Sequence, residues 1–136
     1  ATIAVNRSFH NTLWVPAHFH TYFLVGFVLI LLGFVHHLLG SRAEKMAGIS
    51  FATMLAGGYG FVLMFYLSGL HSVPRRYASY SAIPIRSVAE AGTSFALYGG
   101  ILASVFLLGA LGFYASVILG RSGAAVDAPS AEGAVE

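Results

Sequence analysis

One stretch of this 136-residue chain, TYFLVGFVLILLGFVHHLL at residues 21–39, contains no Asp, Glu, Lys or Arg. With the residues before it, it forms an apolar segment from about residue 13 to 39, which exceeds the roughly 20 residues that a helix needs to cross a bilayer. Two similar segments run from about residue 47 to 70 and from about 91 to 119. Because lipid offers no water to the peptide groups, each segment is expected to be a helix.

The composition excludes most classes of soluble protein. The chain is 57% hydrophobic and 9% charged, whereas soluble domains are about 45–50% apolar and about 25% charged. A chain this short buries only about two-thirds of its surface, so it could not hide these side chains from water. Seven basic against five acidic residues form no basic patch for nucleic acid, and the absence of Cys excludes disulfides and thiolate chemistry. We predict an all-α integral membrane protein with three transmembrane helices.

The predicted organisation is one three-helix membrane domain at residues 1–120, followed by a polar, cytoplasmic tail at residues 121–136. A long link with two prolines, at residues 71–90, joins the second and third helices. Glycine pairs at residues 57–58 and 99–100 are expected to mark close contacts between helices.

Orientation in the membrane is left open by the positive-inside rule. Three spans place the two ends of the chain on opposite sides. One side carries three basic residues (Arg42, Lys45 and Arg121) and the other carries four (Arg7, Arg75, Arg76 and Arg86). If Arg75 and Arg76 bind an anionic cofactor, they should not be counted. The first side then has more basic residues than the second, and the predicted orientation reverses.

Two histidines lie at the start of the first segment. On a helix, the two-residue offset of His18 and His20 is about 200°, so their rings point to opposite faces. Each ring could bind a separate haem iron through one nitrogen while its other N–H donates to a backbone carbonyl. One helix would then hold two haems about 10 Å apart. The alternative is a pair of histidines that form hydrogen bonds between helices, although polar groups inside a membrane are usually functional.

Two adjacent arginines, Arg75 and Arg76, follow the second segment in the motif Pro74-Arg75-Arg76-Tyr77. The planar guanidinium suits carboxylates, and haem carries two propionates. Antiparallel first and second helices bring residues 12–18 and 70–76 to the same side of the membrane. The alternative is an anchor for lipid headgroups.

The motifs HNTLWVPAHFH at residues 10–20 and GLHSVPRRY at residues 69–77 resemble subunit I of the haem–copper terminal oxidases. The resemblance covers about residues 8–119 and corresponds to the last three of the twelve core helices of that subunit. The first motif looks closer to the ba3-type branch than to the mitochondrial-type branch, where Asp replaces Asn11.

The resemblance implies roles for five residues. His18 would be the proximal ligand of the high-spin haem, where oxygen is reduced, and His20 one axial ligand of the low-spin haem. Arg75 and Arg76 would pair with the propionates of both haems, and His10 would lie near a propionate of the high-spin haem.

The resemblance also implies partners. The copper ligands and the second ligand of the low-spin haem would come from a larger chain carrying the other subunit I helices, so we expect a split subunit or a fragment that is inactive alone. A subunit II-like chain, other oxidase subunits and a quinol or small redox protein as electron donor are further expected partners. The reaction would be reduction of oxygen to water, coupled to proton translocation across a prokaryotic plasma membrane, with the N-terminus outside and the C-terminus cytoplasmic.

Three rival functions stay open from the sequence. They are a nitric oxide reductase-like subunit, a haem-free structural subunit of a larger complex, and a two-haem electron-transfer cytochrome. The roles of the other histidines also stay open. His36 and His37 lie about 27 Å along the helix from His18, at the opposite membrane face, and His71 is expected at the outer rim.

Overall fold

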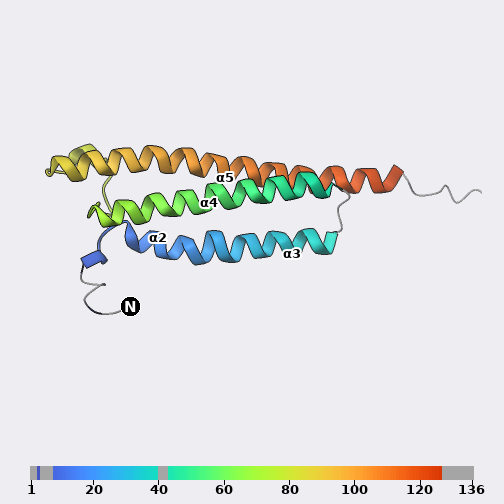
Figure 1. The fold of residues 1–136 in the computed structure, drawn as a ribbon, viewed down its shortest axis with the longest axis horizontal. Helices are drawn as coiled ribbons and strands as arrows, with labels where there is room; N and C mark the ends of the chain where they lie inside the picture. Colours follow the sequence, from blue (N-terminus) through green and yellow to red (C-terminus); the bar gives the residue numbers. More distant parts are fainter. Residues whose placement is uncertain (1–2, 4–7, 40–42, 127–136) are drawn as a thin grey trace, which may run out of the picture.

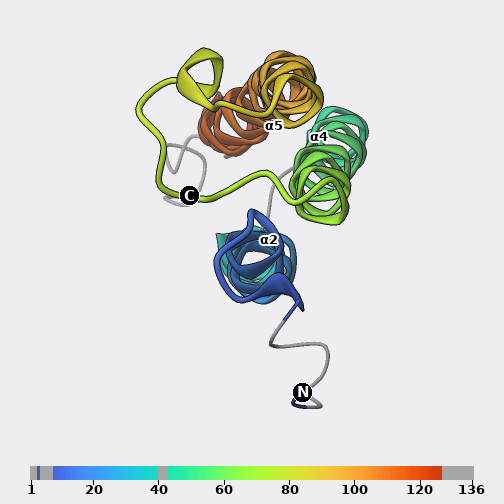
Figure 2. The ribbon, with the colours of Figure 1, turned by 90° about the vertical axis from the view of Figure 1, so that its left-hand side faces the viewer.

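The computed structural model describes residue 3 and residues 8–39 and 43–126, and this part of the chain is helical apart from turns and one isolated β-bridge. Three helical rods in it are long and apolar enough to cross a membrane, which confirms the predicted all-α, three-helix architecture. They lie side by side along their length (Figure 1). Viewed along their axes, they occupy the corners of a triangle (Figure 2).

The first rod is continuous but has three parts: α2 (Trp14–His20), the π-helix η1 (Thr21–Val28) and α3 (Leu29–Leu39). The second rod is α4 (Glu44–Leu70) and the third is α5 (Arg86–Val126). A short 3-10 helix, η2 (Tyr80–Ala82), lies in the link between α4 and α5.

The third helix extends beyond the apolar segment at both ends. It begins at Arg86, inside the predicted link, and its last described residue is Val126. Residues 121–126 of the predicted tail are therefore helical, and residues 127–136 lie outside the described residues. Near its beginning, an ion pair between Arg86 and Glu90 joins successive turns at 2.6 Å.

The π-helical part of the first rod follows from the spacing of its buried residues. Leu13, Ala17, Val25 and Leu29 are buried, at intervals of four or eight residues. An α-helix turns about 100° per residue, so a four-residue repeat drifts about 40° around the helix at each step. The wider π turn rotates less per residue and offsets that drift. The buried side chains therefore stay on the side of the rod that faces α4.

Contact between α4 and α5 is close at one of the two glycine pairs. A Cβ at Gly57 would lie 2.4 Å from the backbone nitrogen of Phe106, and one at Gly58 would lie 3.2 Å from the Phe106 ring. The expectation of close packing is confirmed there. Within the described part of this chain the second pair shows no such close contact, because Gly99 has ordinary contacts at 3.7 Å and Gly100 has no atom within 4 Å of a Cβ position.

A small apolar core joins the rods, and much of the remaining apolar surface is exposed. The core contains Val25, Leu29, Met54, Val62 and Phe113. Only 11% of the most apolar window of the first rod is buried, against 28% for each of the other two. The first rod therefore presents most of its apolar side chains to whatever surrounds it, as expected of a helix in lipid or inside a larger bundle.

Candidate functional site

The turn that ends α4 begins the candidate site. The backbone N–H of Ser72 donates to the carbonyl of Gly69 at 3.0 Å, and that of Val73 donates to the carbonyl of Ser68 at 3.0 Å. These two bonds and a left-handed residue, Ser72 at φ 58°, form a Schellman motif. The motif reverses the chain directly before the two arginines.

A short bridge then ties the arginine loop to the beginning of the first rod. The N–H of Leu13 donates to the carbonyl of Val73 at 2.9 Å, and the N–H of Arg75 donates to the carbonyl of Asn11 at 3.1 Å. Thr12 and Pro74 face each other as an antiparallel β-bridge. The segments that carry the two motifs are thus joined by backbone hydrogen bonds, at the end of the bundle where the link crosses to α5 (Figure 2).

The first rod also meets α4 closely just below this bridge. A Cβ at Gly69 would lie 2.6 Å from the backbone nitrogen of Trp14, so the two backbones touch there. The Trp14 ring stacks on Phe9 at 4.5 Å and meets the edge of Tyr66 at 4.6 Å. These aromatic contacts fix the position of α2 along its axis relative to α4, one turn before the two histidines.

His20 faces α4. Its half-buried ring meets Phe61 and Phe65 edge to face, at 5.8 and 5.6 Å. Its Nδ1 lies 2.6 Å from the carbonyl oxygen of Pro16. Because a carbonyl only accepts, Nδ1 carries the hydrogen, and a neutral ring then keeps its lone pair on Nε2. This is the tautomer that a histidine uses when it binds a metal through Nε2.

His18 lies on the other side of the same helix, as the spacing predicts. Its ring is exposed and meets Tyr22 edge to face at 5.0 Å. It lines a groove of about 430 Å³, with Val15, Phe19, Tyr22, Phe23 and Phe27. The groove is mostly apolar, with the imidazole and the Tyr22 hydroxyl as its polar groups, so it suits a flat apolar group that needs one nitrogen ligand.

The arginines differ in their surroundings. Arg76 is exposed, whereas Arg75 is half-buried and its Nε is fully buried with no hydrogen-bond partner in the described part of the chain. A buried donor without a partner costs about 1–3 kcal/mol, more when it belongs to a charged group. Arg75 thus holds one donor without a partner among the described residues, and anions are the groups that a guanidinium pairs with best. His10, on the neighbouring segment, is exposed.

The donor set suits haem better than a metal ion held by protein ligands alone. Among residues 8–39 and 43–126, no three His, Cys, Asp or Glu side chains form a group that could hold a metal ion. His18 and His20 each present a single imidazole on a separate face. A haem iron takes only one or two axial protein ligands, because the porphyrin supplies the four equatorial nitrogens.

The remaining histidines lie apart from this site. His36 and His37 are at the end of α3, at the opposite end of the bundle (Figure 1). His36 Nε2 is buried without a partner, and its ring lies 5.6 Å from that of Phe113. His71 is exposed near the arginine loop, where its Nδ1 lies 2.9 Å from the carbonyl of Leu67 and its ring 5.3 Å from Phe95.

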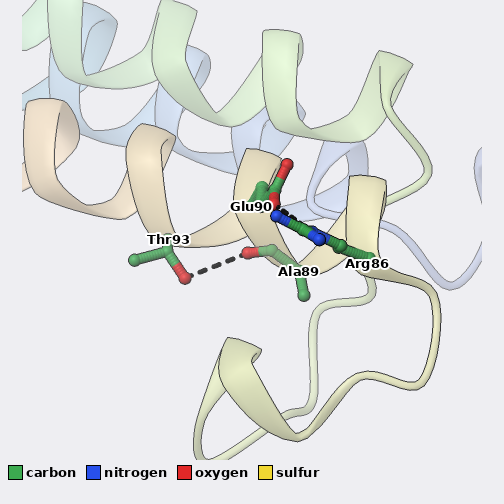
Figure 3. A network of polar contacts seen from close by, with 4 residues as sticks. All are labelled: Arg86, Ala89, Glu90 and Thr93. Atoms are coloured by element: carbon green, nitrogen blue, oxygen red, sulfur yellow. Dashed lines mark hydrogen bonds and ion pairs between the residues drawn. The ribbon is translucent and has the colours of Figure 1, made fainter.

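A second polar cluster lies on the first turns of α5. Arg86 pairs with Glu90, and the Thr93 hydroxyl donates to the carbonyl of Ala89 at 2.9 Å (Figure 3). The Arg86 and Glu90 side chains are 92% and 63% exposed. Exposed ion pairs of this kind contribute about 0–1 kcal/mol. The cluster stabilises the beginning of α5. Its two charged side chains pair with each other and so give no indication of a bound ligand.

Sequence reasoning missed several residues that build the site. Ser72 and Thr12 shape the loop and its bridge, and Phe61, Phe65 and Tyr66 surround the turn that carries His20. The only signal for the aromatic residues was the FxxxFY spacing in the second segment, which reads equally well as ordinary membrane-helix composition.

Comparison with known proteins points to one family. A family model described as "Cytochrome C and Quinol oxidase polypeptide I" matches residues 1–102. The chain is also 32% identical over 135 residues to "Heme-copper oxidase subunit I+III" of Aeropyrum pernix, a match that covers 90% of this chain and 15% of that protein. The chain thus spans less than a sixth of this relative's length. No solved structure matches it significantly.

Proposed function

Since the chain belongs to the family of cytochrome c and quinol oxidase polypeptide I, we propose that it forms one side of two haem sites in a membrane-bound terminal oxidase that reduces oxygen to water. His20 would be an axial ligand of the low-spin haem, and His18 the proximal ligand of the high-spin haem. The observation that carries this proposal is the placement of two imidazoles on opposite faces of one helical turn, in a rod whose beginning is hydrogen-bonded to the arginine loop.

The residues of the chain would hold and orient the haems. Nδ1 of His20 donates to the Pro16 carbonyl, which directs the Nε2 lone pair away from the helix backbone. Arg75 and Arg76 would pair with haem propionates through their planar guanidinium groups. Exposed His10 would lie near a propionate of the high-spin haem. When bound, the haems supply the electron transfer and the oxygen chemistry.

Other parts of the site would come from outside this chain. The copper ligands and the second ligand of the low-spin haem would lie on the other subunit I helices. A subunit II-like chain and an electron donor, either a quinol or a small redox protein such as cytochrome c, complete the proposed set of partners. We propose a prokaryotic plasma membrane as the location, with the arginine loop and the N-terminus outside, the C-terminus in the cytoplasm, and proton translocation coupled to the reaction.

The test is an optical one on the purified complex that contains this chain. His20→Ala should remove the low-spin haem bands from the reduced-minus-oxidised spectrum, and His18→Ala should remove the high-spin haem that binds carbon monoxide. His37→Ala, at the far end of the first rod, is the matched control and should leave both spectra intact. A complex in which His18→Ala and His20→Ala both keep the wild-type spectra would overturn the proposal and favour a haem-free structural subunit.

A further inference from the structure

A hydrogen bond joins α4 to the residue directly after His20. The Tyr66 hydroxyl oxygen lies 3.1 Å from Oγ1 of Thr21. Thr21 has one hydroxyl hydrogen, and it donates that hydrogen to the carbonyl of Ala17 at 2.9 Å. Tyr66 must therefore be the donor in the bond between the two side chains. The result is a chain of bonds that runs from the Tyr66 hydroxyl through Thr21 to the backbone of α2.

This chain of bonds ends beside the anchor of the His20 ring. Ala17 is fully buried, and its carbonyl also accepts the backbone N–H of Thr21. The preceding carbonyl, that of Pro16, accepts Nδ1–H of His20. Two consecutive carbonyls of one turn, those of Pro16 and Ala17, thus accept hydrogen bonds from the side chains of His20 and Thr21. A rotation of that turn about the helix axis would move the Pro16 carbonyl and the imidazole together.

The phenol of Tyr66 is itself held in place. Its ring meets Trp14 at 4.6 Å, and Trp14 rests against the backbone at Gly69. The neighbouring residue Phe65 meets the His20 ring at 5.6 Å. One turn of α4 therefore contacts the imidazole with one residue and restrains the backbone that carries it with the next.

The α-helical part of the first rod also ends at this position. His20 is the last residue of α2, and the π-helix begins at Thr21. Backbone hydrogen bonds change their partners at such a junction, and π segments are often found at functional sites. A side-chain bond to the first π-helical residue fixes where the change occurs, and so fixes the azimuth of His20.

We propose that Tyr66 is a positioning residue for His20: by donating to Thr21 it sets the rotation of the turn that carries the imidazole, and with it the plane in which the ring meets haem iron. This inference rests on the proposed role of His20 as a haem ligand. The effect of Tyr66 passes through Thr21 and the α2 backbone.

The experiment uses the complete oxidase complex and the electron paramagnetic resonance spectrum of its low-spin ferric haem. The g values of such a centre depend on the orientation of its axial imidazole planes. Tyr66→Phe keeps the aromatic ring against Trp14 and removes only the hydroxyl, so it should shift and broaden the low-spin signal. Thr21→Val should have the same effect. The double variant should add nothing to the change in Thr21→Val, because that variant already removes the bond to Tyr66 together with the bond to Ala17.

Two further variants separate positioning from general damage. Thr21→Ser keeps the hydroxyl and should retain the wild-type g values. Tyr59→Phe removes a tyrosine hydroxyl from the same helix at a residue that is 58% exposed, and it should leave the signal unchanged. Thermal stability measured on the same samples identifies a merely structural role, which would lower stability without moving the g values.

Each outcome is decisive. Shifted g values in Tyr66→Phe and Thr21→Val, with wild-type values in Thr21→Ser and Tyr59→Phe, support the inference. An unchanged signal in Tyr66→Phe overturns it, provided that His20→Ala abolishes the low-spin signal. If His20→Ala keeps that signal, the proposed function itself has failed, and the two failures are thereby distinguished.

Discussion

Replacing Gly57 by Ala tests how closely α4 and α5 must approach. The added Cβ would lie 2.4 Å from the Phe106 nitrogen and 2.8 Å from both the Leu102 carbonyl oxygen and the Phe106 Cα. All three are backbone atoms of α5, which no side-chain rotation relieves. Ordinary contact begins at 3.4 Å, so the two helices must separate by about 1 Å along this contact, or α5 must distort.

The expected loss of stability follows from two opposing terms. Overpacking of a close contact costs about 1–3 kcal/mol. Replacing Gly by Ala inside a helix stabilises the helix by about 1 kcal/mol. Gly57→Ala should therefore lower stability by about 1 kcal/mol, within a range of about 0–2 kcal/mol. Ala at Gly48, in α4 itself, or at Gly100, in α5, meets no atom within 4 Å and should show only the favourable helix term.

The assay is the survival of the detergent-solubilised complex, carrying a fluorescent tag on this chain, after heating through a series of temperatures. The fraction that elutes as intact complex gives a midpoint temperature for each variant. We expect the midpoint of Gly57→Ala to lie below those of the wild type, Gly48→Ala and Gly100→Ala, and that of Gly57→Val to be lower still. A midpoint for Gly57→Ala at or above those of both control variants would refute the reasoning from helix contact.

Two further predictions concern the arginine loop and the link that follows it. Ser72 adopts φ 58°, a left-handed conformation that costs a residue with a Cβ about 1–2 kcal/mol. Gly avoids that cost but gives the unfolded chain about 0.4–1 kcal/mol more conformational entropy. Ser72→Gly should therefore leave the stability of the complex unchanged or raise it by about 1 kcal/mol, whereas Ser72→Val should lower it, as read from the same midpoints. Burial raises the pKa of the Tyr80 phenol above its ordinary value of 10.0. The folded protein thus holds that proton more tightly than the unfolded chain, and stability is lost as the pH rises above about 10. Tyr80→Phe cannot ionise there, so its midpoint should fall less than that of the wild type between about pH 9 and 11, and an equal fall in both would contradict the assignment.

Hydropathy predicted the membrane segments well but not the helix ends. The apolar segments reflect the cost of polar groups in lipid, which stops at the membrane surface. A helix continues past that surface if its exposed residues support it, as Arg86 and Glu90 do on the first turns of α5. The limits of α5 therefore depend on local side-chain pairs that an average over an apolar window does not register.

The faces of His18 and His20 were predictable because a two-residue offset is a local property of the helix. The π-helix that follows was not, since it depends on which residues meet α4 over several turns. The left-handed turn at Ser72 could not be predicted from the sequence for another reason. Glycine is the usual residue for a left-handed C-terminal position, and serine gives no comparable signal.

The position of Arg75 was predictable only in part. The antiparallel arrangement of the first two helices predicted that residues 12–18 and 70–76 lie at the same end of the bundle, and the bonds between Leu13 and Val73 and between Arg75 and Asn11 confirm this. That same bridge holds Arg75 where its Nε is buried without a partner. Packing within the chain gains nothing from a buried, unpaired guanidinium nitrogen, because an apolar side chain there would avoid the cost. Packing among the described residues therefore does not explain Arg75, and the anion that the two adjacent arginines predict stays a prediction.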